Sequence, residues 1–336
     1  MRCDARSFAR HNRQRSLVVT IALMILLAPL AGEPQEARKL YRIGSIQSGS
    51  PPLGPGRAFF VQRLGELGWI EGQNVVIETR FAEGKLERLP ALVGDLLRLN
   101  VDVIMANDTP TAKVAKEATR TVPIVIGIGD PVHSGLIASL ARPGGNLTGV
   151  DTMPDVRTKS LQLLREVVPK ASHIGYLVMP DNPAIVRSWQ ELEVATPSLG
   201  VKMRRFDIRE PRDIDTAFAL MARERLGGLV VSADPAVLIP HRQKVVDLAA
   251  KIRIPALYPW RSYVEVGGLM SHGNDQRHIS RLMATYVARI LNGAKPADLP
   301  VERPSKFELV INMRTARALG IPIPPSLLAR ADEIVE

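Results

Sequence analysis

The stretch VDVIMANDTPTAKVAKEATRTVPIVIGIGD, residues 101–130, contains the pattern that decides the fold. Apolar runs at 101–106 and 124–128 are typical of buried strands, and 111–119 shows the spacing of a helix. Asn, Asp and Thr followed by Pro at 107–110 are typical of the start of a helix. A strand, a helix and a second strand in this order predict an α/β fold with a parallel sheet.

The same alternation occupies the chain on both sides of a turn-rich stretch at 142–146. Further strands are predicted at 41–46, 75–81, 173–178, 201–207, 228–232, 254–258, 269–271 and 307–312. Further helices are predicted at 58–67, 86–99, 184–198, 214–225, 239–251 and 278–291. The glycosylation-like triplet at 146–148 is interpreted as part of a turn. The proline-rich segment 295–325 suits an extended chain that crosses between two modules.

The N-terminus has the order of a bacterial secretory signal. Five arginines lie within the first 15 residues, an apolar run of about fifteen residues follows at 17–31, and the chain then becomes polar. This run is shorter than the roughly 20 residues that span a bilayer. We expect a signal peptide at 1–31, cleavage near Ala31 and export to the periplasm, with a retained N-terminal anchor as the alternative. Cys3 is the only cysteine, so the mature chain has neither a disulfide nor a thiol nucleophile.

The formal net charge of +10 does not indicate a nucleic-acid partner. Residues 1–32 contain five Arg and one Asp, which leaves about +6 for the mature chain. The remaining basic residues, such as Lys113, Lys116 and Arg120, are dispersed at helical spacing without interleaved aromatics. We therefore expect no nucleic-acid binding.

Motifs of catalysis and of cofactor binding do not occur in convincing form. Gly127 and Gly129 begin a Gly-x-Gly pattern, but Asp130 and Pro131 follow where a phosphate-binding helix needs a third glycine and free amides. The histidines lack the spacing of a metal site, and no nucleophile with a neighbouring base is recognisable. The sequence therefore predicts a protein without catalytic activity, metal or cofactor.

Polar and aromatic side chains follow the predicted strands in both modules. In parallel α/β sheets, ligands bind beyond the carboxyl ends of the strands. The candidate ligand-binding residues at these places are Ser48, Ser50, Thr109, Thr111, Asp130, Asn182, Asp234, Tyr258 and Trp260. Each polar member has an alternative interpretation as an ordinary helix cap.

The chemistry of these candidates favours a small zwitterion. The hydroxyls of Ser48, Thr109 and Thr111, with amides at helix starts, suit a carboxylate. Acceptors for an ammonium group come from Asp130, Asn182 and Asp234, while Tyr258 and Trp260 offer flat apolar faces. An amino acid fits this set better than a sugar.

Several sequence segments resemble those of the family of ABC transporter substrate-binding proteins whose studied members include binders of tryptophan and other aromatic amino acids. They are LGWIEGQN at 67–74, LARPGGNLTG at 140–149, GGLMS at 267–271 and KFELVIN at 306–312. The resemblance implies a two-lobed periplasmic binding protein of type 1-like fold, with a ligand cleft between the lobes and neither catalysis nor ATP binding. His272 follows GGLMS where many relatives have an aromatic residue, and we include it among the candidate ligand-binding residues.

The resemblance and the residue pattern together predict the organisation of the chain. The first lobe is expected at 38–152 plus 276–300, and the second at 153–275 plus 301–336, each a parallel sheet flanked by helices. We expect a monomeric receptor that closes around a small-molecule ligand and delivers it to ABC permease subunits in the membrane. Alternatives are an exported sensor that docks to a membrane receptor and, from a different class, a hydrolase.

Overall fold

The computed structural model describes residues 39–51, 56–152, 156–304 and 306–336. The predicted signal peptide at 1–31 lies outside these residues. Among the described residues, no helix is long and apolar enough to cross a membrane.

The first lobe is built on a five-stranded parallel sheet with strand order β2-β1-β3-β4-β5. Its strands are β1 (Tyr41–Gln47), β2 (Val75–Phe81), β3 (Val103–Ala106), β4 (Ile124–Ile128) and β5 (Leu147–Asp151). Its helices are α2 (Gly56–Glu66), η1 (Leu86–Arg88), α3 (Leu89–Arg98), α4 (Thr109–Ala118), α10 (Gln276–Leu291) and η3 (Pro296–Asp298).

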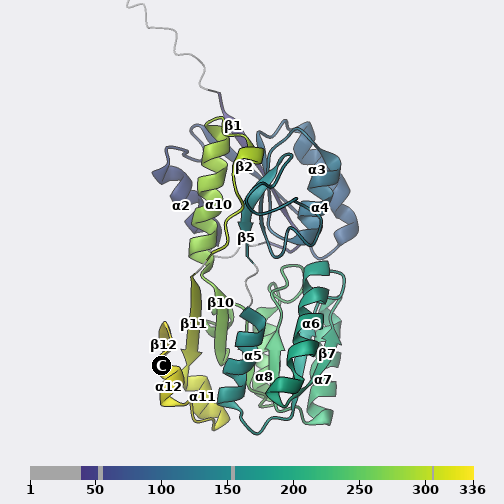
Figure 1. Ribbon diagram of the computed structural model, residues 1–336, viewed down its shortest axis with the longest axis vertical. Coiled ribbons are helices and arrows are strands. Elements are labelled where there is room, and N and C mark those ends of the chain that lie inside the picture. Colours follow the sequence, from purple (N-terminus) through teal and green to yellow (C-terminus); the bar gives the residue numbers. More distant parts are fainter. Residues whose placement is uncertain (1–38, 52–55, 153–155, 305) are drawn as a thin grey trace, which may run out of the picture. The chain divides into compact units, whose positions relative to one another are not determined.

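Apolar side chains cover both faces of this sheet. Ile43 and Met105 pack with α2 and α10 on one face, whereas Ile46 and Ile104 pack with α3 and α4 on the other. Figure 1 shows the two pairs of helices on opposite sides of the strands. Because successive residues of a strand point to opposite faces, a sheet buried on both faces needs these continuous apolar runs.

The second lobe is built on a seven-stranded sheet with strand order β12-β11-β10-β9-β8-β6-β7. Its strands are β6 (His173–Val178), β7 (Lys202–Asp207), β8 (Gly228–Val231), β9 (Ala256–Tyr258), β10 (Met270–Asn274), β11 (Phe307–Asn312) and β12 (Glu333–Val335). Its helices are α5 (Val156–Val167), α6 (Pro183–Ala195), η2 (Pro197–Leu199), α7 (Pro211–Glu224), α8 (Arg242–Lys251), α9 (Arg261–Val264), α11 (Met313–Leu319) and α12 (Pro325–Leu328).

The α/β fold with two sheets flanked by helices confirms the predicted fold class, with one difference in the second sheet. Strands β10 and β11 are antiparallel, whereas the other neighbouring strands of this sheet are parallel. The chain leaves β10 for α10 of the first lobe and returns to begin β11 at the end where β10 finished. This return reverses the direction of β11.

The interpretation of residues 146–148 as a turn is wrong from Leu147 onward, because β5 begins there. Leu147 and Val150 are buried, and the Thr148 hydroxyl donates a hydrogen bond of 2.7 Å to the carbonyl of Leu299. Gly149 has a φ of +141° in this strand, and a Cβ there would lie 2.1 Å from the carbonyl oxygen of Ile126. Burial of the apolar residues therefore outweighs the turn-forming character of this glycine-containing stretch.

The chain passes between the sheets after Asp151, after Asn274 and again before Phe307, and hydrogen bonds tie these passages together. The Asn274 amide donates to the carbonyl of Thr152 at 2.5 Å, and the Arg303 guanidinium donates to the Asp151 carboxylate at 2.8 Å.

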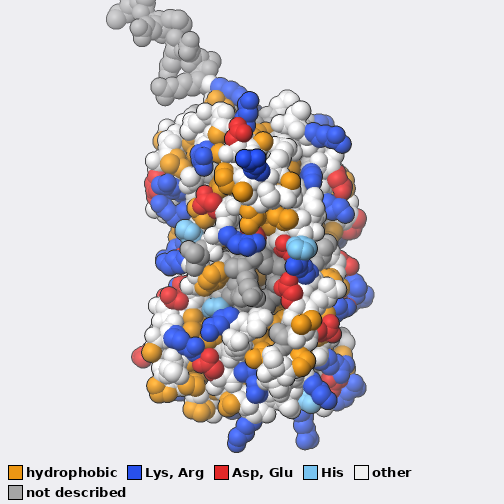
Figure 2. Space-filling view, viewed as in Figure 1, with side chains coloured by type: hydrophobic (Ala, Val, Ile, Leu, Met, Phe, Trp, Pro, Cys, Tyr) orange, Lys and Arg blue, Asp and Glu red, His pale blue; other side chains and the backbone are white. Residues whose placement is uncertain are grey.

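Basic and acidic side chains are interspersed over the face shown in Figure 2, without a continuous basic patch on that face.

Candidate ligand-binding site

A cavity of about 440 Å³ lies between the carboxyl ends of the two sheets. This volume is within the range of about 300–1,000 Å³ typical of small-molecule sites. Residues after β1, β3 and β4 line it from the first lobe, and residues after β8 and β9 and at the end of β10 line it from the second. The edge at which parallel α/β sheets bind ligands is thus shared by both lobes.

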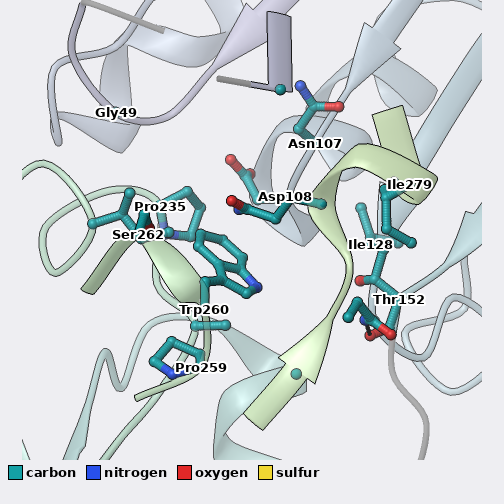
Figure 3. Close-up of a pocket in the computed structure, with 18 of the residues that line it drawn as sticks. Gly49, Asn107, Asp108, Ile128, Thr152, Pro235, Pro259, Trp260, Ser262 and Ile279 are labelled. Atoms are coloured by element: carbon teal, nitrogen blue, oxygen red, sulfur yellow. Dashed lines mark hydrogen bonds between the residues drawn. The ribbon is translucent and has the colours of Figure 1, made fainter. Parts of the chain in front are cut away.

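The indole of Trp260 lies near the middle of this cavity (Figure 3). In this view Asn107 and Asp108 lie above the ring, and Ile128 and Ile279 lie to its right. Trp260 is half-buried and directly precedes α9. Its position gives a ligand a flat apolar surface with polar groups at the edge.

Four buried polar atoms in the cavity wall have no hydrogen-bond partner among the residues that the structure describes. They are the Asn107 Oδ1, Ser232 Oγ, Arg242 Nε and Asn274 Oδ1 atoms. A buried polar atom without a partner costs about 1–3 kcal/mol, so such atoms are uncommon in native structures. Acceptors and donors are both present, which suits a ligand with groups of both kinds.

Asp108 lines the cavity and begins α4 as its N-cap. One carboxylate oxygen accepts the Thr111 amide at 2.8 Å, and the other accepts the Ser48 hydroxyl at 2.6 Å. Burial raises the pKa of Asp108, while these hydrogen bonds lower it. Ser48 and Thr111 therefore hold Asp108 in place, and neither is among the described residues of the cavity wall.

Asp234 lies at the corresponding place after β8 in the second lobe and is fully buried. One of its carboxylate oxygens accepts the amides of Val237 and Leu238 at 2.7 and 3.1 Å. Burial raises the pKa of Asp234 to about 6, and the charge of Asp108 raises it further toward that value. Carboxylates from the two lobes thus lie close enough to repel each other, although Asp234 does not line the cavity.

The other predicted residues divide into two groups. Ser50, Thr109, Asn182, Trp260 and His272 line the cavity. Asp130 lies outside its wall and forms an ion pair of 2.9 Å with Arg187 of α6, from the second lobe. Tyr258 is also outside the wall, because its ring is buried against Tyr263 at a centroid distance of 4.9 Å and an angle of 14°. The structure therefore does not place the Tyr258 ring where it can contact a ligand in this cavity.

The cavity residues absent from the predicted set are mostly at or near strand ends too. Asn107 and Asp108 follow β3, Ser232 follows β8, and Asn274 ends β10. Thr109 and Asp234 were selected because ligands bind beyond the carboxyl ends of parallel strands, and the same reasoning could have selected these neighbouring residues. Arg242 is different, because it reaches the cavity from the first turn of α8, and no local pattern distinguishes it from the other arginines.

No group of three or more histidine, cysteine or acidic side chains that could hold a metal occurs among the described residues. The ionisable side chains of the described cavity wall are Arg57, Asp108, Tyr176, Arg242 and His272.

The family described as ABC transporter substrate binding protein matches residues 56–335. The chain belongs to this family. It is 26% identical over 279 residues to a tyrosine-binding protein of Clostridioides difficile strain R20291, with 81% of this chain and 78% of that protein covered. These findings confirm the resemblance in the sequence.

Two solved structures have folds similar to that of this chain. An ABC domain in complex with L-Trp from Streptococcus pneumonia has a TM-score of 0.79 at 25% identity, covering 88% of this chain and 99% of that one. A ligand-free, open structure of a substrate-binding protein with adhesive properties from Clostridium difficile has a TM-score of 0.63 at 25% identity, with the same coverage. The structural neighbours therefore share the fold of periplasmic binding proteins.

Proposed function

We propose that this substrate-binding protein is the periplasmic receptor of an ABC importer and that it binds an amino acid in the cavity between its lobes. The observation that carries the proposal is the set of unpartnered buried donors and acceptors in the wall of the cavity that Trp260 also lines. A zwitterion has an anionic and a cationic end, and both find partners in this wall.

The ligand carboxylate is assigned to Arg242 and Ser232. The Arg242 Nη1 atom donates to the carbonyl of Ile239 at 3.3 Å, while its Nε atom has no partner among the described residues. A guanidinium forms strong charge-assisted hydrogen bonds with a carboxylate, and the Ser232 hydroxyl adds a further donor.

The ligand ammonium is assigned to Asn107 and Asp108, and Asn274 and Asn182 line the same cavity. The free Asn107 Oδ1 and Asn274 Oδ1 atoms accept hydrogen bonds, and the Asp108 carboxylate supplies the opposite charge. Thr109 and Ser50 add hydroxyls, and Trp260 stacks on the ligand side chain. The names of the relatives, one of which binds tyrosine and one of which is in complex with L-Trp, favour an aromatic amino acid.

Ligand capture is proposed to occur by hinge closure between lobes at 38–152 plus 276–300 and at 153–275 plus 301–336. The chain resembles the L-Trp complex more closely than the ligand-free, open relative, although both are 25% identical to it. The ion pair between Asp130 and Arg187 supports a closed arrangement, because these residues belong to different lobes. Ligand that contacts both lobes stabilises the closed state through its higher affinity for that state.

The proposal is tested on purified mature protein with a thermal-shift screen of the twenty amino acids, purines, sugars and organic acids. An amino acid at about 100 times its dissociation constant adds about 2.7 kcal/mol to the free energy of unfolding. Arg242→Gln is expected to raise the Kd for that amino acid about tenfold or more, since it removes a charged hydrogen bond. Arg223→Gln is the matched control, because Arg223 is an exposed residue of α7. Stabilisation by sugars or purines but by no amino acid would overturn the proposal.

A further inference from the structure

The second-lobe end of the cavity contains an apolar row with one polar pair. Tyr176 pairs with Val230 on the neighbouring strand, and residues Val230 and Leu257 pair in turn. These three side chains line the cavity and belong to the apolar core beneath α5. A ligand that reaches this end meets a mostly apolar floor.

His272 continues this row on β10. Leu257 pairs with Met270, and His272 is two residues further along, so its side chain points to the same face. The His272 Nδ1 atom is 3.2 Å from the hydroxyl of Ser160, which is buried in α5. Both residues line the cavity, and they form a hydrogen-bonding pair at this end.

The imidazole of His272 is neutral near neutral pH. Burial lowers its pKa to about 4, Lys159 lowers it further toward that value, and Asp332 opposes the shift. A neutral imidazole has one ring nitrogen that donates and one that accepts. The Ser160 hydroxyl can either donate to Nδ1 or accept from it, so the contact is compatible with both tautomers, and Nε2 forms no hydrogen bond with the residues that the structure describes.

We propose that His272 and Ser160 form a specificity-determining subsite for a neutral hydrogen-bonding group at the far end of the ligand side chain. The subsite accepts a hydroxyl or a ring N–H. It disfavours a charged group, because the apolar wall and the neutral imidazole leave a charge without compensation. It also disfavours a wholly apolar side chain, which leaves the His272 Nε2 atom without a hydrogen-bond partner.

The inference rests on the proposed function, since it assumes an amino acid with its charged groups at the Asn107 and Arg242 end. It adds that the side chain extends from Trp260 toward β10. Among aromatic amino acids, this chemistry favours tyrosine over phenylalanine, which differ by one hydroxyl.

The experiment measures the Kd values of L-tyrosine and L-phenylalanine by calorimetry for the wild type and for three variants. His272→Phe removes both ring nitrogens and keeps an aromatic ring. Ser160→Ala removes the orienting hydroxyl with a smaller change in volume. His173→Phe is the matched control, because exposed His173 makes the same type of contact, 3.0 Å from Nδ1 to the Ser172 hydroxyl, on the surface.

The wild type and His173→Phe are expected to bind tyrosine at least about tenfold more tightly than phenylalanine, since a site built for a hydroxyl rejects the analogue without it. In His272→Phe the ratio should approach one, and in Ser160→Ala it should fall partway. The wild-type ratio should stay constant from pH 5.5 to 8, because His272 remains neutral there.

Equal binding of the two amino acids by the wild type, or an unchanged ratio in both cavity variants, would overturn the subsite and leave the proposed function intact. The subsite would also be overturned if the ratio of the two Kd values changed with pH around a midpoint near 6.5. Failure of every amino acid to bind the wild type would overturn the proposed function together with the subsite.

Discussion

Gly49 of the first lobe and Pro235 of the second approach so closely that a Cβ on Gly49 would lie 2.4 Å from the Pro235 carbonyl oxygen. Gly49 directly follows Ser48, which binds Asp108, and Pro235 directly follows Asp234. The two buried carboxylates are thus brought near each other by the same contact between loops. Only a residue without a side chain permits this approach without displacement of the loops.

Gly49→Ala is therefore expected to hinder closure while the lobes fold normally. Gly49 is not among the glycines with positive φ, so alanine is compatible with its backbone conformation. We expect the Kd for the bound amino acid to rise about tenfold or more, with little change in the melting temperature of the ligand-free protein. Calorimetry measures the affinity, and small-angle scattering measures ligand-induced compaction. Gly65→Ala is the control, because a Cβ there meets open space; equal affinities in both variants would contradict the prediction.

The ion pair between Arg187 and Asp130 is expected to slow ligand release. Its atoms are 2.9 Å apart, and it joins the two lobes. Arg187→Gln should increase the dissociation rate constant by a few-fold to about tenfold, since pairs of this kind contribute about 0.2–1 kcal/mol when exposed and more when buried. Stopped-flow release measures the rate constant. Glu191→Gln is the matched variant, because Glu191 contacts the same arginine at 2.8 Å within α6. The same increase of the dissociation rate constant in both variants would show that the ion pair between the lobes does not slow ligand release.

Asp234 is expected to make stability fall as pH rises between about 4 and 6. Its pKa is about 6 in the folded protein and about 4 when unfolded, so over this range the folded state binds more protons. The stabilisation is fully present below pH 4 and is lost as pH rises through 6. The shift corresponds to roughly 3 kcal/mol. Denaturant unfolding of the wild type and Asp234→Asn should show a difference in slope over this window, and parallel pH profiles would contradict the assignment.

Trp260 is expected to report ligand binding through its fluorescence, because it is the tryptophan of the described cavity wall. Trp69 packs edge-on against Tyr41, and Trp189 stacks on Tyr176. Addition of a proven ligand should shift the emission of the wild type, and Trp260→Phe should lose most of that response. A full response in the variant would place the ligand elsewhere or assign the signal to Trp189.

The fold was predictable from the sequence because its strands are buried runs and its helices are amphipathic. The strands at 75–81, 124–128 and 173–178 have the bounds expected from their apolar residues. Helix α5 was not predicted. Its buried residues Leu161, Leu164 and Val167 recur every three residues, a spacing from which the helix could have been predicted.

The site was predictable in its location and less so in its members. Thr109, Asn182 and Trp260 could be identified as cavity residues because they follow the carboxyl ends of strands, which a parallel topology brings to the same edge of each sheet. Tyr258 was misplaced because the sequence does not show on which side of the β9 end the ring lies. Arg242 reaches the cavity because of how α8 packs in the second lobe, and the residues next to Arg242 in the sequence do not indicate this position.

The crossings of the chain between the lobes also have a consequence for the order in which the protein can fold. The first sheet is complete once Asp151 has been synthesised, but α10, which covers Ile43 and Met105, ends at Leu291. A nascent chain therefore exposes one apolar face of its first sheet until most of the second lobe has followed. Deletion of the last fifty residues would remove β11 and β12 from the second sheet and residues 287–291 of α10 from the core of the first lobe, so both lobes should be destabilised.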